Sequence, residues 1–236
     1  MRIGIDASFL EPAARYTGMG VYTAGLLQGL ADLGLRLSAA QTQQLNDYLG
    51  LIQKWTRVYN LTAVRDEEDM LTHHVLDSLS VIAPLGRALS AMALDHSPQV
   101  LDVGSGGGLP GVVMAIARPD ILVTCVDTVA KKAAFIQQVA AQLPLPNLQG
   151  VHARVETLAG PYDLICSRAF ASLSDFTAWS RQALGPSGVW LAMKGKTPTV
   201  TSSIFMRPTP ATTLSTVPTG GVTKPIELLM MNSTPK

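Results

Sequence analysis

The run LDVGSGGGLPG at residues 101–111 indicates the fold class, because its glycines follow an apolar run and precede a helical one. Glycine is needed where a backbone turns tightly and approaches a ligand without a Cβ in the way. Short apolar runs alternate with helical stretches along the rest of the chain. This alternation predicts right-handed βαβ units, and therefore an α/β fold with a parallel sheet covered by helices on both faces. The predicted strands are 100–103, 121–126, 148–155, 163–166 and 189–193, and the predicted helices are 109–118, 130–142 and 173–184.

Two features of the loop favour S-adenosylmethionine as its ligand. Asp102 stands just before the first glycine, where a carboxylate can reach the ligand's ammonium and would repel a pyrophosphate. The turn from Gly104 to Gly106 comes directly off the strand, so its backbone amides face the amino-acid half of the ligand. As an alternative, Asp102 anchors the loop by accepting backbone amides.

A nominal dinucleotide fingerprint is also present at Gly106, Gly108 and Gly111, and alone it is a weak signal. It keeps an NAD(P)-dependent oxidoreductase as the alternative function. Asp127 ends the second predicted strand, where its two oxygens can accept hydrogen bonds from both ribose hydroxyls of either ligand. The competing interpretation of Asp127 is a cap on the helix that begins near residue 130.

An N-terminal helical extension, residues 25–95, is expected before the cofactor-binding domain at 96–196. Apolar residues three or four apart predict an amphipathic helix over 38–59, and Ser38 with Gln41 suggests a capping box. A second helix is expected from Asp66. The apolar stripe of the first helix is Leu45, Leu49, Ile52, Trp55 and Tyr59, and that of the second is Leu71, Val75, Leu79 and Ile82.

The two ends of the chain differ from its middle. Residues 1–24 predict a strand, a glycine turn and a helix start, and they resemble the opening of retaining glycosyltransferases. Residues 197–236 are rich in Thr, Pro and Ser, a composition typical of an irregular or disordered tail. Only 226–231 has the character of a strand, so we expect the last strands of the sheet to be absent or replaced.

Composition limits the partners. A formal net charge of +1 creates no global field that attracts nucleic acid, so RNA binding requires a local cluster of Lys and Arg. Cys125 and Cys166 fall in the second and fourth predicted strands, which are too far apart for a disulfide. Because neither a membrane-length apolar run nor a secretory signal is visible, we expect a soluble, cytoplasmic protein without membrane or metal.

From about residue 25 to 196 the chain resembles the family of ribosomal RNA small subunit methyltransferase G, also called glucose-inhibited division protein B. The resemblance is carried by YNLTAV at 59–64, HVLDSL at 74–79, LDVG at 101–104 with GLPG at 108–111, and SRAFA at 167–171. It implies a Rossmann-like, seven-stranded methyltransferase sheet and S-adenosylmethionine as methyl donor. It also implies N7 of a guanine in 16S ribosomal RNA, free or in the small ribosomal subunit, as acceptor.

The resemblance further implies cofactor contacts at Gly104 and Leu109 in the loop, at Val155 and Glu156 for the adenosine, and at Arg168 after the fourth strand. N7 of guanine carries a free lone pair, so no general base is expected. Since a guanidinium would oppose the cationic product, Arg168 is assigned to the methionine carboxylate or an RNA phosphate. A structural ion pair is the alternative.

RNA contacts are inferred more loosely, because scattered charges on helices are often only a solvated face. Trp55 and Tyr59 could stack bases, although their spacing favours core packing. A non-catalytic RNA-binding protein with a degraded cofactor site therefore also stays open. The candidate RNA-binding residues are Lys54, Arg57, Arg65, His73, His74, Lys131, Lys132 and Lys194.

Overall fold

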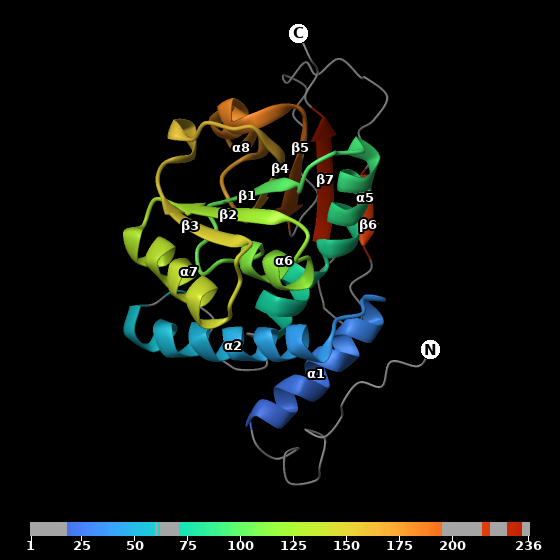
Figure 1. Ribbon diagram of the computed structural model, residues 1–236, viewed down its shortest axis with the longest axis vertical. Coiled ribbons are helices and arrows are strands. Elements are labelled where there is room, and N and C mark those ends of the chain that lie inside the picture. The colour runs from blue at the N-terminus through green and yellow to red at the C-terminus, as the bar shows by residue number, and fades with distance from the viewer. Residues whose placement is uncertain (1–17, 60, 62–70, 195–213, 218–225, 233–236) are drawn as a thin grey trace.

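The computed structural model describes residues 18–59, 61, 71–194, 214–217 and 226–232, and these form a seven-stranded sheet with helices on both faces (Figure 1). The strand order is β3-β2-β1-β4-β5-β7-β6. Strands β1 to β5 run parallel, so the predicted βαβ alternation is confirmed. Their bounds are β1 (Gln99–Val103), β2 (Leu122–Asp127), β3 (Leu148–His152), β4 (Tyr162–Arg168) and β5 (Leu184–Lys194).

The expectation that the last strands are missing is wrong. Strand β7 (Ile226–Asn232) pairs antiparallel with β5, and β6 (Leu214–Val217) pairs antiparallel with β7. The composition of the tail misled because it averages over strands and connections. The described strand segments, LSTV and IELLMMN, contain no proline, and Thr is a good strand former. Strand β5 is therefore paired on both sides.

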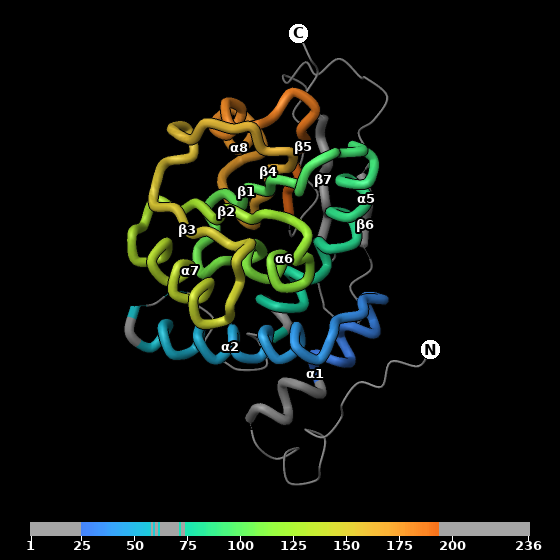
Figure 2. The backbone as a smooth tube through the Cα atoms, in the orientation of Figure 1, coloured from blue at the N-terminus to red at the C-terminus, as the bar shows by residue number. Residues whose placement is uncertain are grey.

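Helices α6 (Gly111–Ala117) and α7 (Ala130–Gln142) cover one face of the sheet, and α8 (Leu173–Ser180) covers the other. The strand order changes direction at β1, which lies inside the sheet with β2 on one side and β4 on the other (Figure 2). Ligands of such sheets bind at the carboxyl ends of the strands, where the order reverses. Single turns are formed by η4 (Val155–Thr157) and η5 (Arg181–Ala183).

Helix α2 (Ala39–Tyr59) confirms the predicted amphipathic helix and its capping box. The Ser38 amide donates to Oε1 of Gln41 at 2.9 Å, and the Gln41 amide donates to Oγ of Ser38 at 3.2 Å. The Gln41 side-chain amide also donates to the Ile116 carbonyl at the end of α6, at 2.8 Å. Gln44 does the same for the Leu143 carbonyl after α7, at 2.7 Å. These bonds fix α2 across both helices.

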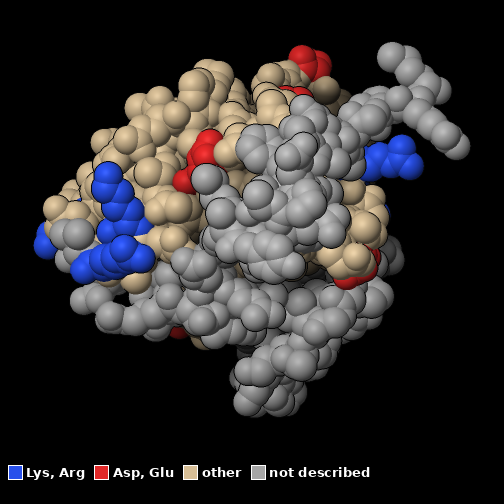
Figure 3. Space-filling model, turned by 90° about the horizontal axis from the view of Figure 1, so that it is seen from below, with Lys and Arg blue, Asp and Glu red and all other residues tan. Residues whose placement is uncertain are grey.

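The C-terminal end of α2 lies beside the start of α7. Trp55 packs on Phe135 of α7 with ring centroids 5.1 Å apart, which confirms core packing for Trp55. Tyr59 is 46% exposed, and the Lys131 ammonium lies 5.3 Å from its ring centroid. Lys and Arg side chains gather at one side of the face in Figure 3. The last turns of α2 and the first turn of α7 carry four basic residues that we call the basic cluster: Lys54, Arg57, Lys131 and Lys132.

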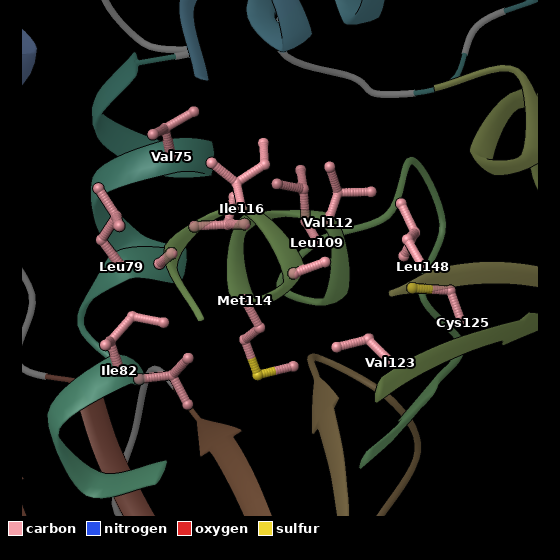
Figure 4. Close-up of a cluster of buried hydrophobic side chains, with 14 of the residues drawn as sticks. Val75, Leu79, Ile82, Leu109, Val112, Met114, Ile116, Val123, Cys125 and Leu148 are labelled. Carbon is pink, nitrogen blue, oxygen red and sulfur yellow. The ribbon is translucent and has the colours of Figure 1, made fainter. Parts of the chain in front are cut away.

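The start predicted for the second helix, at Asp66, lies outside the described residues. The described part of this helix comprises η3 (Leu71–Leu76), α4 (Asp77–Leu79) and α5 (Ile82–Met92). Figure 4 shows Val75, Leu79 and Ile82 on the side of the helix that faces α6, and with Leu71 they are buried as predicted. The stretch His74–Met92 is long and apolar enough to cross a membrane, yet 56% of its window is buried inside the protein. That burial makes it weak evidence for a membrane span.

Helix α1 (Gly18–Asp32) is continuous across residues 24 and 25. The boundary between an N-terminal segment and the helical extension was expected between these two residues. The helix start predicted within residues 1–24 is present, and the helix already begins at Gly18, inside the predicted glycine turn. The strand predicted before it lies outside the described residues. Cys125 and Cys166 are buried free thiols with β1 between their strands, as expected.

Candidate cofactor site

The glycine loop leaves β1 in left-handed backbone conformations, with φ of 68° at Gly104, 57° at Gly106 and 90° at Gly108. These angles favour glycine. The amides of Gly104 and Ser105 donate to the Val126 carbonyl of β2, at 2.9 and 3.2 Å. The loop is thus tied to the neighbouring strand at the carboxyl edge of the sheet.

Asp102 is fully buried beneath the loop. Its Oδ2 accepts the Gly111 amide at 2.8 Å, and the Cys166 thiol donates to Oδ1 at 3.7 Å. Burial raises the pKa of Asp102 to about 7, against the lowering effect of the Gly111 hydrogen bond. This geometry is that of a carboxyl group anchoring the loop, which was the alternative interpretation of Asp102.

Asp127 joins the loop to the end of β2 and is 7% exposed. Its Oδ2 accepts the Gly106 amide at 3.0 Å, and its Oδ1 accepts the Val129 amide at 2.9 Å. The second bond is an Asx turn that leads into α7, whose N-cap residue is Val129. The Lys132 ammonium lies 3.5 Å from Oδ2. Each carboxylate oxygen keeps a further lone pair with which it can accept a hydroxyl.

The remaining predicted cofactor residues lie around this pair. Val155 is buried in η4, which follows β3 at the same edge of the sheet. Glu156 is held by its own backbone amide and by Arg154 at 3.0 Å, and both lower its pKa. Leu109 is buried, and its amide donates to the Ser105 carbonyl at 3.0 Å. The structure brings these residues together with Asp127 along β1, β2 and β3.

Arg168, at the end of β4, forms an ion pair with Asp77 of α4, with 3.1 Å between Nη1 and Oδ2. Both side chains are about one-fifth exposed, at 20% and 22%. The pair connects the sheet to the N-terminal helical region, in agreement with the alternative of a structural ion pair. It leaves the anion-binding role of Arg168 as a proposal.

The predicted RNA-binding residues are only partly brought together. The basic cluster is on the surface, but His74 is 6% exposed and belongs to the interior of the helical region. Arg65 and His73 lie outside the residues whose side chains the structure describes, as does the side chain of Lys194 in β5.

Two residues next to the loop were missed by the sequence analysis. The Tyr48 hydroxyl, from α2, donates to the Gly107 carbonyl at 2.6 Å. Phe170, after β4, lies against Gly104. Tyr48 lies next to the apolar stripe of α2, between Leu45 and Leu49, so its position in the sequence resembled that of a core residue. Phe170 is inside the SRAFA motif, which was the available signal.

Gly111→Ala is expected to lower the free energy of unfolding by about 3 kcal/mol, because a Cβ there has no room. It would overlap the Cys125 sulfur and lie 2.8 Å from Oδ2 of Asp102. Urea unfolding measures the loss. In the matched control, Gly107→Ala, the added Cβ meets no atom within 4 Å. Equal stabilities of the two variants would show that Gly111 is not tightly packed under the loop.

The parallel sheet with antiparallel final strands, the glycine loop after β1 and the acid at the end of β2 define a Rossmann-like methyltransferase. The model of the family rRNA small subunit methyltransferase G matches residues 41–204, and the chain belongs to that family.

Two relatives show the extent of the similarity. The ribosomal RNA small subunit methyltransferase G of Acidovorax sp. is 64% identical over 177 residues, covering 73% of this chain and 78% of the relative. That of Albidiferax ferrireducens is also 64% identical over 177 residues, covering 72% and 79%. Among solved structures, a SAM dependent methyltransferase from Aquifex aeolicus is similar at a TM-score of 0.46 and 15% identity, covering 70% of this chain and 98% of that one.

Proposed function

We propose that this protein transfers a methyl group from S-adenosylmethionine to N7 of a guanine in small-subunit (16S) ribosomal RNA. The observation that carries the proposal is the pairing of the glycine loop with Asp127 through the Gly106 amide, in a chain of this methyltransferase family. Family membership argues against the oxidoreductase alternative.

The loop fits the cofactor because its glycines divide into two groups. At Gly104, Gly108 and Gly111 the place of a Cβ is taken by protein atoms, so these glycines serve internal packing. At Gly106 and Gly107 a Cβ would meet no atom within 4 Å. The loop therefore presents an open backbone surface next to Asp127, and we infer that the nucleoside binds there, with Val155 and Glu156 toward the adenosine.

When bound, S-adenosylmethionine supplies an electrophilic sulfonium methyl. The residues of the chain have to orient it and exclude water, because N7 offers its lone pair without losing a proton. The charge of Arg168 would oppose the positive charge that develops on the guanine. The Asp77 carboxylate offsets the charge of this guanidinium, with 3.1 Å between Oδ2 and Nη1. We infer that the same guanidinium is oriented toward the methionine carboxylate or an RNA phosphate.

We infer that the basic cluster binds RNA phosphates. Lys54, Arg57 and Lys131 are exposed, and Lys132 lies 3.5 Å from Oδ2 of Asp127, so the cluster extends to the cofactor site. A concentrated group of cations is needed because the protein as a whole carries a net charge of only +1. Cytoplasmic location and binding to the small ribosomal subunit follow as further parts of the proposal.

Arg57→Ala combined with Lys131→Ala is expected to weaken binding of small-subunit ribosomal RNA roughly 10-fold and to make it less dependent on salt, since two phosphate contacts are lost. Filter binding over a salt series measures both quantities. The control is Arg36→Ala, which removes an exposed cation in the segment that precedes α2. Equal losses in the control and the double variant would mean that the cluster is only a solvated face.

The proposal is tested by incubating the full chain with methyl-labelled S-adenosylmethionine and small-subunit ribosomal RNA from cells that lack the modification. We expect label in one guanine, released as 7-methylguanine. RNA from modified cells is the control and should accept no label. RNA binding without methyl transfer would instead support the non-catalytic alternative.

A further inference from the structure

Phe170 occupies the place that a side chain at Gly104 would fill. A Cβ built on Gly104 would overlap Cδ2 of Phe170 and lie 3.0 Å from its Cε2. The aromatic ring therefore rests directly on the first glycine of the cofactor loop. Because Gly104 follows β1 and Phe170 follows the adjacent strand β4, the contact connects the cofactor loop to the loop before α8.

Two further aromatic rings hold Phe170 in place. Phe176 lies 6.4 Å away between ring centroids at an interplanar angle of 75°, and Trp179 lies 5.9 Å away at 79°. Both are edge-to-face arrangements, which aromatic pairs prefer. Phe176 is fully buried and Trp179 is 42% exposed, so this group of rings extends from the core to the surface. Phe170 itself is half-buried between them and the loop.

The backbone around Phe170 is strained on both sides. Ala169 has a φ of 53° and Ala171 a φ of 28°, in the region that side chains other than glycine avoid. Both alanines are exposed, so their side chains gain little from packing. Such strain persists where the surrounding structure enforces it, and it concentrates at ligand-binding sites. The two strained residues flank the side chain that lies against Gly104.

We propose that Phe170 is the base-stacking residue of the methyl-transfer site, and this inference rests on the proposed function. The ring lies beside the cofactor loop, where the acceptor base must meet the methyl donor. Aromatic side chains stack on unpaired bases. Methylation at N7 makes the purine cationic, and the face of an aromatic ring attracts a cation, whereas a guanidinium would repel it. Stacking therefore strengthens as the reaction proceeds.

The test compares Phe170→Leu, which keeps an apolar side chain without a π face, with Phe170→Tyr, which keeps the ring. With S-adenosylmethionine and unmodified small-subunit ribosomal RNA both saturating, we expect Phe170→Leu to lower the single-turnover rate of methyl transfer roughly 10- to 100-fold. Phe170→Tyr should stay within about threefold of the wild type, because the stacking surface is retained. S-adenosylmethionine affinity, measured by calorimetry, should change little in either variant.

A second measurement requires no methyl transfer. In the presence of S-adenosylhomocysteine, the wild-type chain and Phe170→Tyr should bind 7-methylguanosine monophosphate more tightly than guanosine monophosphate. Phe170→Leu should lose this preference, a difference of roughly 3- to 30-fold. An unchanged rate and preference in Phe170→Leu would overturn the inference. So would a loss of cofactor affinity as large as the loss of rate, which would show that Phe170 only supports the loop.

If the wild type leaves ribosomal RNA unmethylated, the proposed function fails, and the nucleotide-binding measurement still decides the role of Phe170. A preference for the methylated nucleotide that depends on the ring would support stacking. Its absence from the wild type would refute it.

Discussion

Asp127→Ala is expected to weaken S-adenosylmethionine binding about 100-fold, or ~2.7 kcal/mol. In the free protein its two oxygens accept the amides of Gly106 and Val129, at 3.0 and 2.9 Å. The substitution removes both acceptors, so the loop loses its connection to β2 through this side chain. It also removes the proposed acceptor for the ribose hydroxyls, and a hydrogen bond to a charged group contributes about 1.5–3 kcal/mol.

Calorimetric titration with S-adenosylmethionine measures the effect, and urea unfolding shows whether the variant remains folded. The control is Asp47→Ala, which removes an exposed carboxylate of α2 that accepts a local hydrogen bond from Gln43. A folded Asp127→Ala variant with the affinity of the wild type would remove Asp127 from the cofactor site. Its role would then be limited to turning the chain between β2 and α7.

The second large effect concerns the pH dependence of stability. Burial raises the pKa of Asp102 from 3.8 to about 7. The native state therefore holds a proton that the unfolded chain has already released above about pH 4. The resulting stabilisation is fully present below about pH 4 and is lost as the pH rises through about 7. The difference of about three pKa units amounts to up to about 4 kcal/mol.

Asp102→Asn should remove this dependence, because an amide imitates the neutral carboxyl group and can still accept the Gly111 amide. We expect the stability of the variant relative to the wild type to increase between about pH 5 and about pH 8. Urea unfolding at both values measures the change. Other groups titrate equally in both proteins and cancel in the difference. A constant difference would mean that Asp102 is ionised throughout this range.

Much of the fold could be predicted because local patterns and tertiary packing agree. The stripe of α2 faces α6 and α7, and the bonds of Ser38 and Gln41 are those that a capping box requires. The start and end of α7 were predicted to the residue. The prediction for the final strands was wrong because these strands derive their stability from pairing with β5, which is distant in the sequence. Their local composition does not reveal that pairing.

The site was predictable in type and less so in detail. The sequence placed Asp102 and Asp127 at the ends of two strands, which was sufficient to locate the loop. The hydrogen bond of Asp102 to the start of α6 was not decided by the sequence, because it depends on how closely Gly111 approaches β1 and β2. The partner of Arg168 comes from a helix 91 positions earlier in the chain, and no local pattern identifies Asp77 as that partner.

We propose that the open part of the glycine loop binds S-adenosylmethionine next to Asp127. Calorimetric titration of the purified full chain with S-adenosylmethionine, and separately with NAD, tests this binding. We predict saturable binding of one equivalent of S-adenosylmethionine and no heat of binding with NAD. A folded protein that binds NAD, or that has no measurable affinity for S-adenosylmethionine, would contradict the account.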